Sequence, residues 1–414
     1  MVSEIFIRMV GIFSSRLITF LTSLYIASIL SEGEWGRISL MMNYFTIFLV
    51  FAGNFFPRAI TTYTAQNIPN TSNSNSALII GNRIVLIASA FTIICGIIFI
   101  KFANPISDTQ SESLLLLLLL MVSVPVLSQN IICYFQGLGK VGLMTILELV
   151  RSITTSAIII FGVKSLNESL TGWTYGKSLG ILLTLFILII VYYGNRAGNI
   201  FKWKYSDIQL YDKLKKYFYW GLLGAVFSIA IRNIDVIIIS NTFHNDARTG
   251  LFKLSILFFT AFGLFGQSIT SALHHRIAAL ADNLPALKLF TFKMKLITIP
   301  IYCLVALILF IYSANITTFI FGDKYIELGA ILKIILIASI FQIYTFINGG
   351  VWAGIGNMKM NSQFFSISSI VYIIILILFI NKFDFLLFPY ALLISSIFAA
   401  VYSEYLYRKL LKVS

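Results

Sequence analysis

Runs of about 20 predominantly apolar residues recur along this chain, and they constrain its fold more than any other feature. Each run is long enough to cross a hydrocarbon layer of about 30 Å as an α-helix. Backbone amides in lipid must be satisfied within their own segment, so such runs are helical. Because 58% of the 414 residues are hydrophobic and only 11% are charged, the sequence predicts an all-α polytopic membrane protein.

The apolar pattern predicts twelve transmembrane helices. The predicted spans of the first half are residues 5–30, 38–63, 77–102, 114–135, 141–163 and 172–193. Those of the second half are residues 217–242, 250–273, 289–313, 328–348, 362–380 and 385–407. The first run extends to Leu30 without a clear small-residue cleavage site, so we expect it to remain in the protein as a span.

A basic polar segment, residues 195–216, interrupts the apolar pattern near the middle of the chain. It is predicted to be a cytoplasmic linker between two six-helix bundles, residues 1–194 and 217–414, which carry matching segments at nearly one separation. The matches are Gly36–Leu40 with Gly250–Leu254, Phe102–Asn104 with Ser313–Asn315, and Gly137–Lys140 with Gly354–Asn357. Because six spans is an even number, both bundles insert the same way up. The sequence therefore predicts two parallel six-helix repeats around a central cavity, as in alternating-access transporters.

Positive charge is concentrated on one side of the predicted spans. The N-terminus, segment 195–216 and the C-terminus lie on the side that carries most of the loop Lys and Arg, so both termini are predicted to be cytoplasmic. This asymmetry accounts for the formal net charge of +14, and no nucleic-acid partner is predicted. The three cysteines are odd in number and lie inside apolar runs, which indicates no disulfide framework.

Basic residues also lie inside the predicted spans: Arg16, Arg151, Lys177, Arg232, Lys253 and Lys333. A charge at mid-membrane costs at least ~2.5–3.5 kcal/mol, so it normally faces a watery cavity or a partner. Lys253, Thr260 and Gln267 recur at heptad spacing on one helical face. Asn43 and Asn54 share a face of the second span. These patterns predict a cationic cavity lined by the first, second, seventh and eighth spans.

A structural role is the alternative for these cations. Glu148 lies one helical turn from Arg151, and Asp235 lies one turn from Arg232. Each pair could neutralise itself without any ligand. Lys177 lies near the end of its span, where a long side chain can reach the membrane interface by snorkelling.

Four short motifs occur in a characteristic order. They are Ser31-Glu32-Gly33-Glu34-Trp35-Gly36 after the first span, Phe135-Gln136-Gly137-Leu138-Gly139 after the fourth, Asp235 in the seventh, and Phe321-Gly322-Asp323-Lys324-Tyr325 before the tenth. With these motifs, its length and its two sets of six spans, the chain resembles the polysaccharide transporter (Wzx-type O-antigen flippase) family. That family belongs to the multidrug/oligosaccharidyl-lipid/polysaccharide exporter superfamily, and the resemblance covers nearly the whole chain.

The resemblance implies a flippase of the bacterial inner membrane. Its implied substrate is an undecaprenyl-pyrophosphate-linked oligosaccharide, an O-antigen or capsule repeat unit, moved from the inner to the outer leaflet by alternating access. The cations that would meet the pyrophosphate or acidic sugars are Arg16, Arg151, Arg232 and Lys253. The polar residues that would contact sugar hydroxyls are Asn43, Asn54, Thr260 and Gln267. Asp235 and Glu148 are candidate ion-coupling groups. Implied partners are the lipid-linked oligosaccharide and membrane lipids, with the polysaccharide polymerase and chain-length machinery as further candidates.

The alternative function is an ion-coupled multidrug exporter of the same superfamily, which should carry unpaired lumenal carboxylates for cationic drugs. The first span has no acid beyond Glu4, and the interior charges are mainly basic, which favours the flippase. A lipid II flippase would also resemble this chain but usually carries two further spans. No enzyme is predicted, because Gly139-Lys140 lacks the rest of a phosphate-binding loop and no catalytic acid cluster is present. The histidines show no metal-ligand spacing, so neither cofactor nor metal is predicted.

Overall fold

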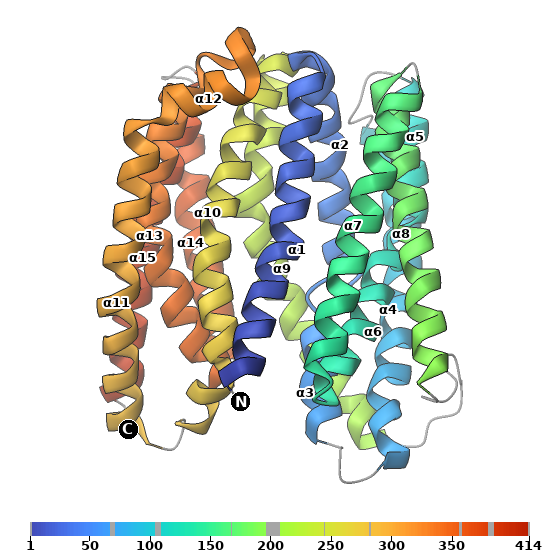
Figure 1. Cartoon of the computed structure of the whole chain (residues 1–414), viewed down its shortest axis with the longest axis vertical. Helices are drawn as coiled ribbons and strands as arrows, with labels where there is room; N and C mark the ends of the chain where they lie inside the picture. The colour runs from blue at the N-terminus through green and yellow to red at the C-terminus, as the bar shows by residue number, and fades with distance from the viewer. Residues whose placement is uncertain are drawn as a thin grey trace. The chain divides into compact units, whose positions relative to one another are not determined.

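The computed structural model of this chain describes residues 2–66, 71–103, 109–166, 168–195, 208–243, 245–280, 283–355, 358–379 and 385–412. Every element in these residues is a helix (Figure 1), which confirms the predicted all-α class. The helices of the first half are α1 (Val2–Ile29), α2 (Glu32–Phe51), α3 (Pro57–Gln66), α4 (Thr71–Ala103), α5 (Thr109–Leu120), α6 (Ser123–Gly137), α7 (Val141–Ser165) and α8 (Ser169–Gly194). Those of the second half are α9 (Ile208–Phe243), α10 (Asp246–Ala279), α11 (Leu284–Ile311), α12 (Ser313–Phe321), the short 3₁₀ helix η1 (Gly322–Tyr325), α13 (Leu328–Gly354), α14 (Met358–Phe379) and α15 (Leu387–Lys412).

Nine stretches of the described residues are long and apolar enough to cross a membrane, judged by length and composition. They are Asn75–Ala103, Thr109–Gly137, Val141–Ser165, Ser169–Gly194, Asp246–Leu264, Leu284–Ile311, Leu328–Trp352, Lys359–Phe379 and Leu387–Leu410. A shorter apolar stretch, Phe13–Ile29, lies in α1. The multi-pass class is therefore confirmed. The number twelve stays a prediction, because α1, α2 with α3, and α9 are not among the nine.

The second predicted span, residues 38–63, is not one continuous helix, and that prediction is wrong. The helix α2 ends at Phe51, and α3 begins at Pro57. Gly53 between them has a φ of 98°, a conformation that glycine adopts without steric cost. Irregular backbone at membrane depth is tolerated where protein or a wet cavity surrounds it, so this break is a place to look for a site. The fourth predicted span is likewise divided, into α5 and α6.

The described helices form two compact units, and each unit takes residues from more than one part of the sequence. Unit 1 contains residues 1–9, 23–40 and 227–414, and unit 2 contains residues 10–22 and 41–226. These bounds differ from those of the predicted bundles, because parts of α1, α2 and α9 group with the other half of the chain. The division into two six-helix repeats stays a prediction.

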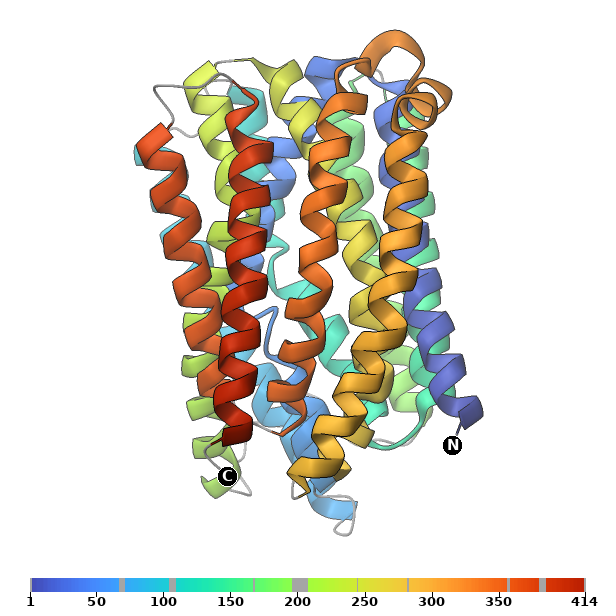
Figure 2. The ribbon, with the colours of Figure 1, turned by 90° about the vertical axis from the view of Figure 1, so that its left-hand side faces the viewer.

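The predicted linker and the chain ends can be placed in part. Residues 208–216 form the first turns of α9, whereas residues 196–207 lie outside the described residues. The beginning of α1 and the end of α15, both in unit 1, lie at the same end of that unit (Figures 1 and 2). An even number of crossings would produce this arrangement. The cytoplasmic location of both termini stays a prediction.

In unit 2, glycines let α7 and α8 pack at short distance. A Cβ added at Gly162 would lie 2.4 Å from the carbonyl oxygen of Gly172, and one at Gly176 would lie 2.8 Å from that of Ile158. Small residues at such positions allow helix backbones to approach closely in membranes. The two helices accordingly lie side by side (Figure 1), and both contribute residues to the site described below.

In unit 1, α13 is the central helix. It packs against α10, α11 and α15, and Figure 2 shows α11, α13 and α15 side by side. Ile343 and Ile347 of α13 are both 0% exposed and belong to one apolar cluster with Phe262 and Tyr302. The rings of Phe262 and Tyr302 meet edge to face, with centroids 4.5 Å apart. This core fixes the helices that surround the pocket described below.

The starts of α2 and α10 are built alike. Ser31 precedes α2, where its Oγ accepts a hydrogen bond from the Glu34 N–H at 3.3 Å, and Glu34 Oε2 accepts one from the Ser31 N–H at 2.9 Å. This reciprocal pair is a capping box. Asn245 precedes α10, and its Oδ1 accepts a hydrogen bond from the Arg248 N–H at 3.2 Å. In both cases a polar side chain satisfies an amide that the first helical turn leaves unpaired.

These two helix starts contact each other within unit 1, and the contact is reciprocal. A Cβ on Gly36 would lie 1.8 Å from the carbonyl oxygen of Asp246, and a Cβ on Gly250 would lie 2.9 Å from that of Glu32. The pair Glu32 and Gly36 is separated from the pair Asp246 and Gly250 by one constant number of positions. A two-fold relation between repeats would produce contacts of this kind.

Candidate functional site

Unit 2 brings several of the predicted site residues together. Arg16 of α1 interacts electrostatically with Arg58, at the start of α3, and with Glu148 and Arg151 of α7. Arg151 also interacts with Lys177 of α8. We call these five residues the cationic cluster. Four basic side chains around one carboxylate leave an excess of positive charge among α1, α3, α7 and α8.

Hydrogen bonds between α1, α6 and α7 position the cluster. Ser15 Oγ lies 2.5 Å from Ser152 Oγ and 3.4 Å from the backbone carbonyl oxygen of Glu148, which holds α1 against α7. Gln129 of α6 lies between the charged side chains of α7. Its Nε2 donates to Glu148 Oε1 at 3.3 Å, and its Oε1 accepts from Arg151. The side-chain amide of Gln129 therefore bridges Glu148 and Arg151, which the sequence analysis considers as a direct ion pair.

The members of the cluster differ in accessibility. Arg16 and Arg58 are exposed, Arg151 is half-buried, and Glu148 is only 9% exposed. The side chains of Arg16 and Arg58 thus have exposed surface, whereas the carboxylate of Glu148 is withdrawn. An arginine fork binds phosphate oxygens in a bidentate manner. The arrangement suits a phosphate or another multivalent anion.

The two predicted asparagines of unit 2 differ as well. Asn54 lies in the break between α2 and α3, where it is exposed, and its backbone N–H donates to the Leu49 carbonyl oxygen at 3.0 Å. Asn43, in α2, is 0% exposed. Asn54 is accessible to a ligand in this structure, and Asn43 is not. A sugar contact by either residue stays a prediction.

Unit 1 contains the buried acid of the seventh predicted span. Asp235 of α9 is 0% exposed, and neither carboxylate oxygen has a hydrogen-bond partner among the described residues. The Tyr372 hydroxyl lies near it without forming a regular hydrogen bond, and Lys253 of α10 interacts with it electrostatically. A buried carboxylate requires a compensating cation or a proton, which suits this group to ion coupling. Within the described residues, no three His, Cys, Asp or Glu side chains are placed to hold a metal ion.

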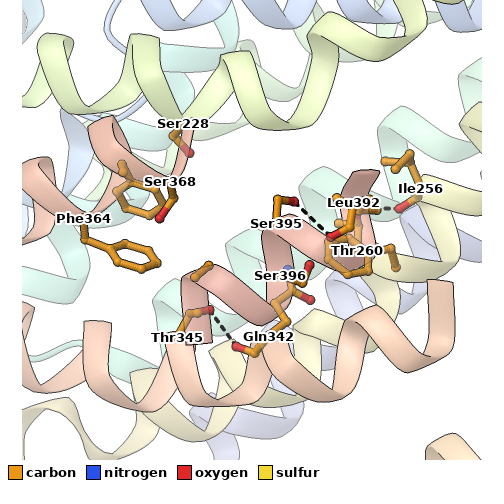
Figure 3. Close-up of a pocket in the computed structure, with 13 residues that line it drawn as sticks. Ser228, Ile256, Thr260, Gln342, Thr345, Phe364, Ser368, Leu392, Ser395 and Ser396 are labelled. Atoms are coloured by element: carbon orange, nitrogen blue, oxygen red, sulfur yellow. Dashed lines mark hydrogen bonds between the residues drawn. The ribbon is translucent and has the colours of Figure 1, made fainter. Parts of the chain in front are cut away.

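A pocket of about 80 Å³ lies in unit 1 between α9, α10, α13, α14 and α15 (Figure 3). Its lining residues are Ser228, Ile256, Phe259, Thr260, Gln342, Thr345, Phe364, Phe365, Ser368, Leu392, Ser395, Ser396 and Ala399. None of these side chains is ionisable. The dashed lines of Figure 3 mark hydrogen bonds that Thr260, Thr345 and Ser395 donate to carbonyl oxygens of their own helices. Hydroxyl, amide and aromatic groups thus meet in one uncharged space.

The remaining predicted site residues are placed in part. Thr260 lines the pocket. The side chains of Arg232 and Gln267 lie outside the described part of the structure, although their backbones belong to α9 and α10. Among the predicted cations, Arg16 and Arg151 are brought together. One cavity lined by residues from both halves of the chain stays a prediction.

Two features of these sites are missing from the sequence analysis. Arg58 lies inside the predicted span 38–63 and is not among the predicted site residues. The break after Phe51 places it at the start of α3, and the sequence signal for that break was Gly53 followed by Pro57. Apart from Thr260, none of the pocket residues is among the predicted site residues, because no charged residue lies among them. Ser and Thr in apolar helices commonly bond their own backbone, so hydroxyls such as that of Ser368 do not stand out from the sequence.

Comparisons with known proteins show the family of this chain and its fold. The model of the polysaccharide biosynthesis protein family matches residues 1–255, more than half of the chain. No curated protein matches. Among solved structures, the inward-facing conformation of a multidrug resistance MATE family transporter of the MOP superfamily has a TM-score of 0.82 at 10% identity, covering 99% of this chain and 98% of that chain.

Two further solved structures agree. The outward-facing conformation of a multidrug resistance MATE family transporter of the MOP superfamily has a TM-score of 0.76 at 11% identity, covering 99% of this chain and 96% of that chain. A MOP superfamily transporter from Pyrococcus furiosus Vc1 (DSM3638), described as having a binding pocket of reverse polarity that suggests a different function, has a TM-score of 0.73 at 12% identity, covering 99% and 95%. At these identities the similarity shows the fold, which is that of MOP-superfamily transporters.

Proposed function

Since this chain belongs to the polysaccharide biosynthesis protein family and has the fold of MOP-superfamily transporters, we propose that it is a flippase for lipid-linked oligosaccharides. The proposed substrate is an undecaprenyl-pyrophosphate-linked O-antigen or capsule repeat unit. The protein moves it from the cytoplasmic to the outer leaflet of a bacterial inner membrane by alternating access. It forms and breaks no covalent bond of the substrate, and in this proposal it is not an enzyme.

The cationic cluster is the observation that carries this proposal. Arg16 and Arg58 are exposed side chains in the neighbourhood of Arg151, and fixed cations lower the free energy of a phosphate that has left water. Outward movement of a dianion across an inside-negative potential is favourable by about 4–5 kcal/mol per 100 mV. The proposed transport therefore needs no ATP.

The other site residues receive roles by their chemistry. Arg16 and Arg151, with Arg232 and Lys253 of the second half, attract the pyrophosphate. Asn54, Thr260 and Gln267 contact sugar hydroxyls. Asn43 is buried in this structure, so its proposed sugar contact belongs to another conformation of the transport cycle. Asp235 and Glu148 couple transport to a cation or a proton, and the burial of Asp235 without a regular hydrogen bond supports this role for Asp235.

Gene deletion followed by lipid analysis tests the function. The deleted strain is expected to accumulate a lipid-linked saccharide on the cytoplasmic leaflet and to lose surface glycan. Wild-type protein and the variant Arg408→Ala should both restore the glycan. The Arg408 side chain is exposed and pairs with Glu404, outside the cationic cluster. Arg16→Ala should insert in the membrane at wild-type level without restoring the glycan.

The alternative, an ion-coupled multidrug exporter, gives a different result in the same strain. No lipid-linked saccharide would accumulate, and the cells would become sensitive to cationic dyes. That combination would replace the flippase proposal with the exporter. Normal surface glycan with Arg16→Ala would remove the cationic cluster from the mechanism.

A further inference from the structure

The pocket of unit 1 contains polar atoms that lack a partner. The side-chain amide oxygen of Gln342 and the hydroxyl of Ser368 are buried, and neither has a hydrogen-bond partner among the described residues. A buried polar group without a partner costs roughly 1–3 kcal/mol. These two atoms belong to α13 and α14, whose side chains line the same pocket. Rotation of either side chain towards the pocket would let a ligand there supply the missing hydrogen bond.

The other hydroxyls of the pocket are arranged to accept hydrogen bonds. Thr260 donates to the Ile256 carbonyl oxygen at 2.8 Å, and Thr345 donates to that of Gln342 at 2.7 Å. A hydroxyl whose proton is used in this way still has lone pairs free to accept. A ligand with several hydroxyl donors therefore matches these acceptors. The hydroxyl of Ser368 can rotate, so it can donate to such a ligand or accept from it.

The shape and charge of the pocket narrow the ligand further. Phe364 forms part of the wall and is held by Trp352 at 5.4 Å and by Tyr402, which stacks on it at 6.2 Å between ring centroids. The apolar C–H face of a sugar ring packs well on such an aromatic surface. The pocket volume of about 80 Å³ is well above the ~10–15 Å³ needed to hold one water, so the pocket has room for a few water-sized groups such as the hydroxyls of a sugar ring.

We propose that this pocket binds one uncharged sugar ring of the transported glycan. The inference rests on the proposed flippase function and adds a subsite to it. Gln342 and Ser368 read the hydroxyls of the ring, and Phe364 packs against its apolar face. An acidic sugar is disfavoured, because none of the lining side chains is a cation that could pair with its carboxylate.

Binding measurements on the purified full-length protein in detergent test this subsite. The probes are farnesyl pyrophosphate and the same molecule linked to glucose or to glucuronic acid. The wild-type protein is expected to bind the glucose probe about three- to tenfold more tightly than the sugar-free probe. The glucuronic acid probe should show no such gain. In Gln342→Leu and Ser368→Ala, the ratio of the two affinities should fall towards one, while affinity for farnesyl pyrophosphate stays unchanged.

Thermal stability separates binding from a structural role. Because the two polar atoms have no partner in the free protein, their replacement by apolar groups should leave the melting temperature unchanged or raise it. Ser255→Ala is the matched control. Ser255 is buried in α10, donates to the Phe252 carbonyl oxygen at 2.7 Å and does not line the pocket. It should leave the affinity ratio as in wild type.

The outcomes distinguish the subsite from the function. If farnesyl pyrophosphate binds but glucose adds no affinity, or the two variants keep the wild-type ratio, the subsite is wrong and the flippase stands. An equal gain with glucuronic acid would likewise overturn the uncharged subsite. If wild-type protein binds neither farnesyl pyrophosphate nor its glucose derivative, the proposed function and the subsite both fall.

Discussion

The cationic cluster of unit 2 and the pocket of unit 1 differ in the one property that decides what each can bind. The cluster contains basic residues with exposed surface, such as Arg16, whereas the pocket is lined by hydroxyl, amide and aromatic groups without charge. A charged ligand gains most at the first and an uncharged one at the second. A lipid-linked oligosaccharide carries both kinds of group, a pyrophosphate and a chain of sugars.

The backbone around the two regions differs in a related way. Arg58 follows a break in a helix, where Gly53 adopts a φ of 98°. The pocket is formed by five helices that are continuous where they line it. A broken helix can bring a charged side chain and irregular backbone to a wet site. Continuous helices instead hold small hydroxyls at fixed depth, which suits shape recognition more than charge capture.

The largest expected effect comes from removing a cation of the cluster. Arg16→Ala should weaken binding of farnesyl pyrophosphate by about 10- to 100-fold, because a hydrogen bond to a charged group is worth about 1.5–3 kcal/mol. Titration of the purified protein measures the effect. Arg16→Lys should keep part of the affinity if charge alone matters, and little of it if the bidentate fork matters.

The matched control for this prediction is Arg408→Ala. Arg408 pairs with Glu404 at 3.3 Å, and its side chain is 73% exposed, so its removal should leave binding unchanged. A loss of affinity equal to that of Arg16→Ala would mean that net charge, and not the cluster, governs binding. The distinction between the two regions would then lose its basis.

The next largest effect comes from disturbing the contact between the starts of α2 and α10, which lies outside both binding regions. Gly36→Ala would place a Cβ 1.8 Å from the Asp246 carbonyl oxygen, so the two helix starts must move apart. We expect a loss of about 1–3 kcal/mol in stability and slower transport, with affinity for farnesyl pyrophosphate unchanged. Thermal unfolding, a flux assay and titration measure these three quantities.

Gly349→Ala is the control for this close contact. Gly349 lies in α13, and no atom lies within 4 Å of the position of an added Cβ. Alanine there should leave stability unchanged or raise it by roughly 0.5–1 kcal/mol, because glycine inside a helix is the less favourable residue. Equal destabilisation by both substitutions would argue against the reciprocal contact as the cause.

Helix positions could be predicted well from the sequence where composition alone determines them. Predicted spans 141–163 and 172–193 correspond to α7, Val141–Ser165, and α8, Ser169–Gly194. Lipid leaves a long apolar segment no alternative to helix. The break around Gly53 could not be predicted in the same way, because glycine and proline are tolerated inside membrane helices, and packing decides whether the helix breaks.

The candidate site was predictable only where charge marked it. An isolated arginine in an apolar run is a strong local signal, which identifies Arg16 and Arg151. That Arg58 lies near them could not be predicted, because α1, α3 and α7 come together only in the folded unit. The pocket depends on five helices, and a hydroxyl such as that of Ser368 has no distinguishing pattern along the chain.

A smaller effect is expected from salt, and it compares the two regions in one experiment. Raising the ionic strength from 0.1 to 1 M shortens the screening length from about 10 to about 3 Å. Affinity for farnesyl pyrophosphate should fall several-fold, because the exposed cations of the cluster are screened. The additional affinity for the glucose probe should remain, because hydrogen bonds to uncharged groups are not screened. If salt reduced the additional affinity for glucose as much as the affinity for farnesyl pyrophosphate, charge would contribute to ligand binding in the pocket.

The smallest effect concerns an arginine that lies outside both regions. Arg37 Nε lies 3.0 Å from Asp246 Oδ2, with the two side chains 61% and 40% exposed. Because exposed ion pairs contribute about 0–1 kcal/mol, Arg37→Ala should change thermal stability little and leave farnesyl pyrophosphate binding at the wild-type level. Arg37 and Arg16 carry the same charge, so a difference between their variants isolates the effect of position. A tenfold loss of binding with Arg37→Ala would show that phosphate recognition extends to the start of α2, and the cluster would have to be enlarged to include it.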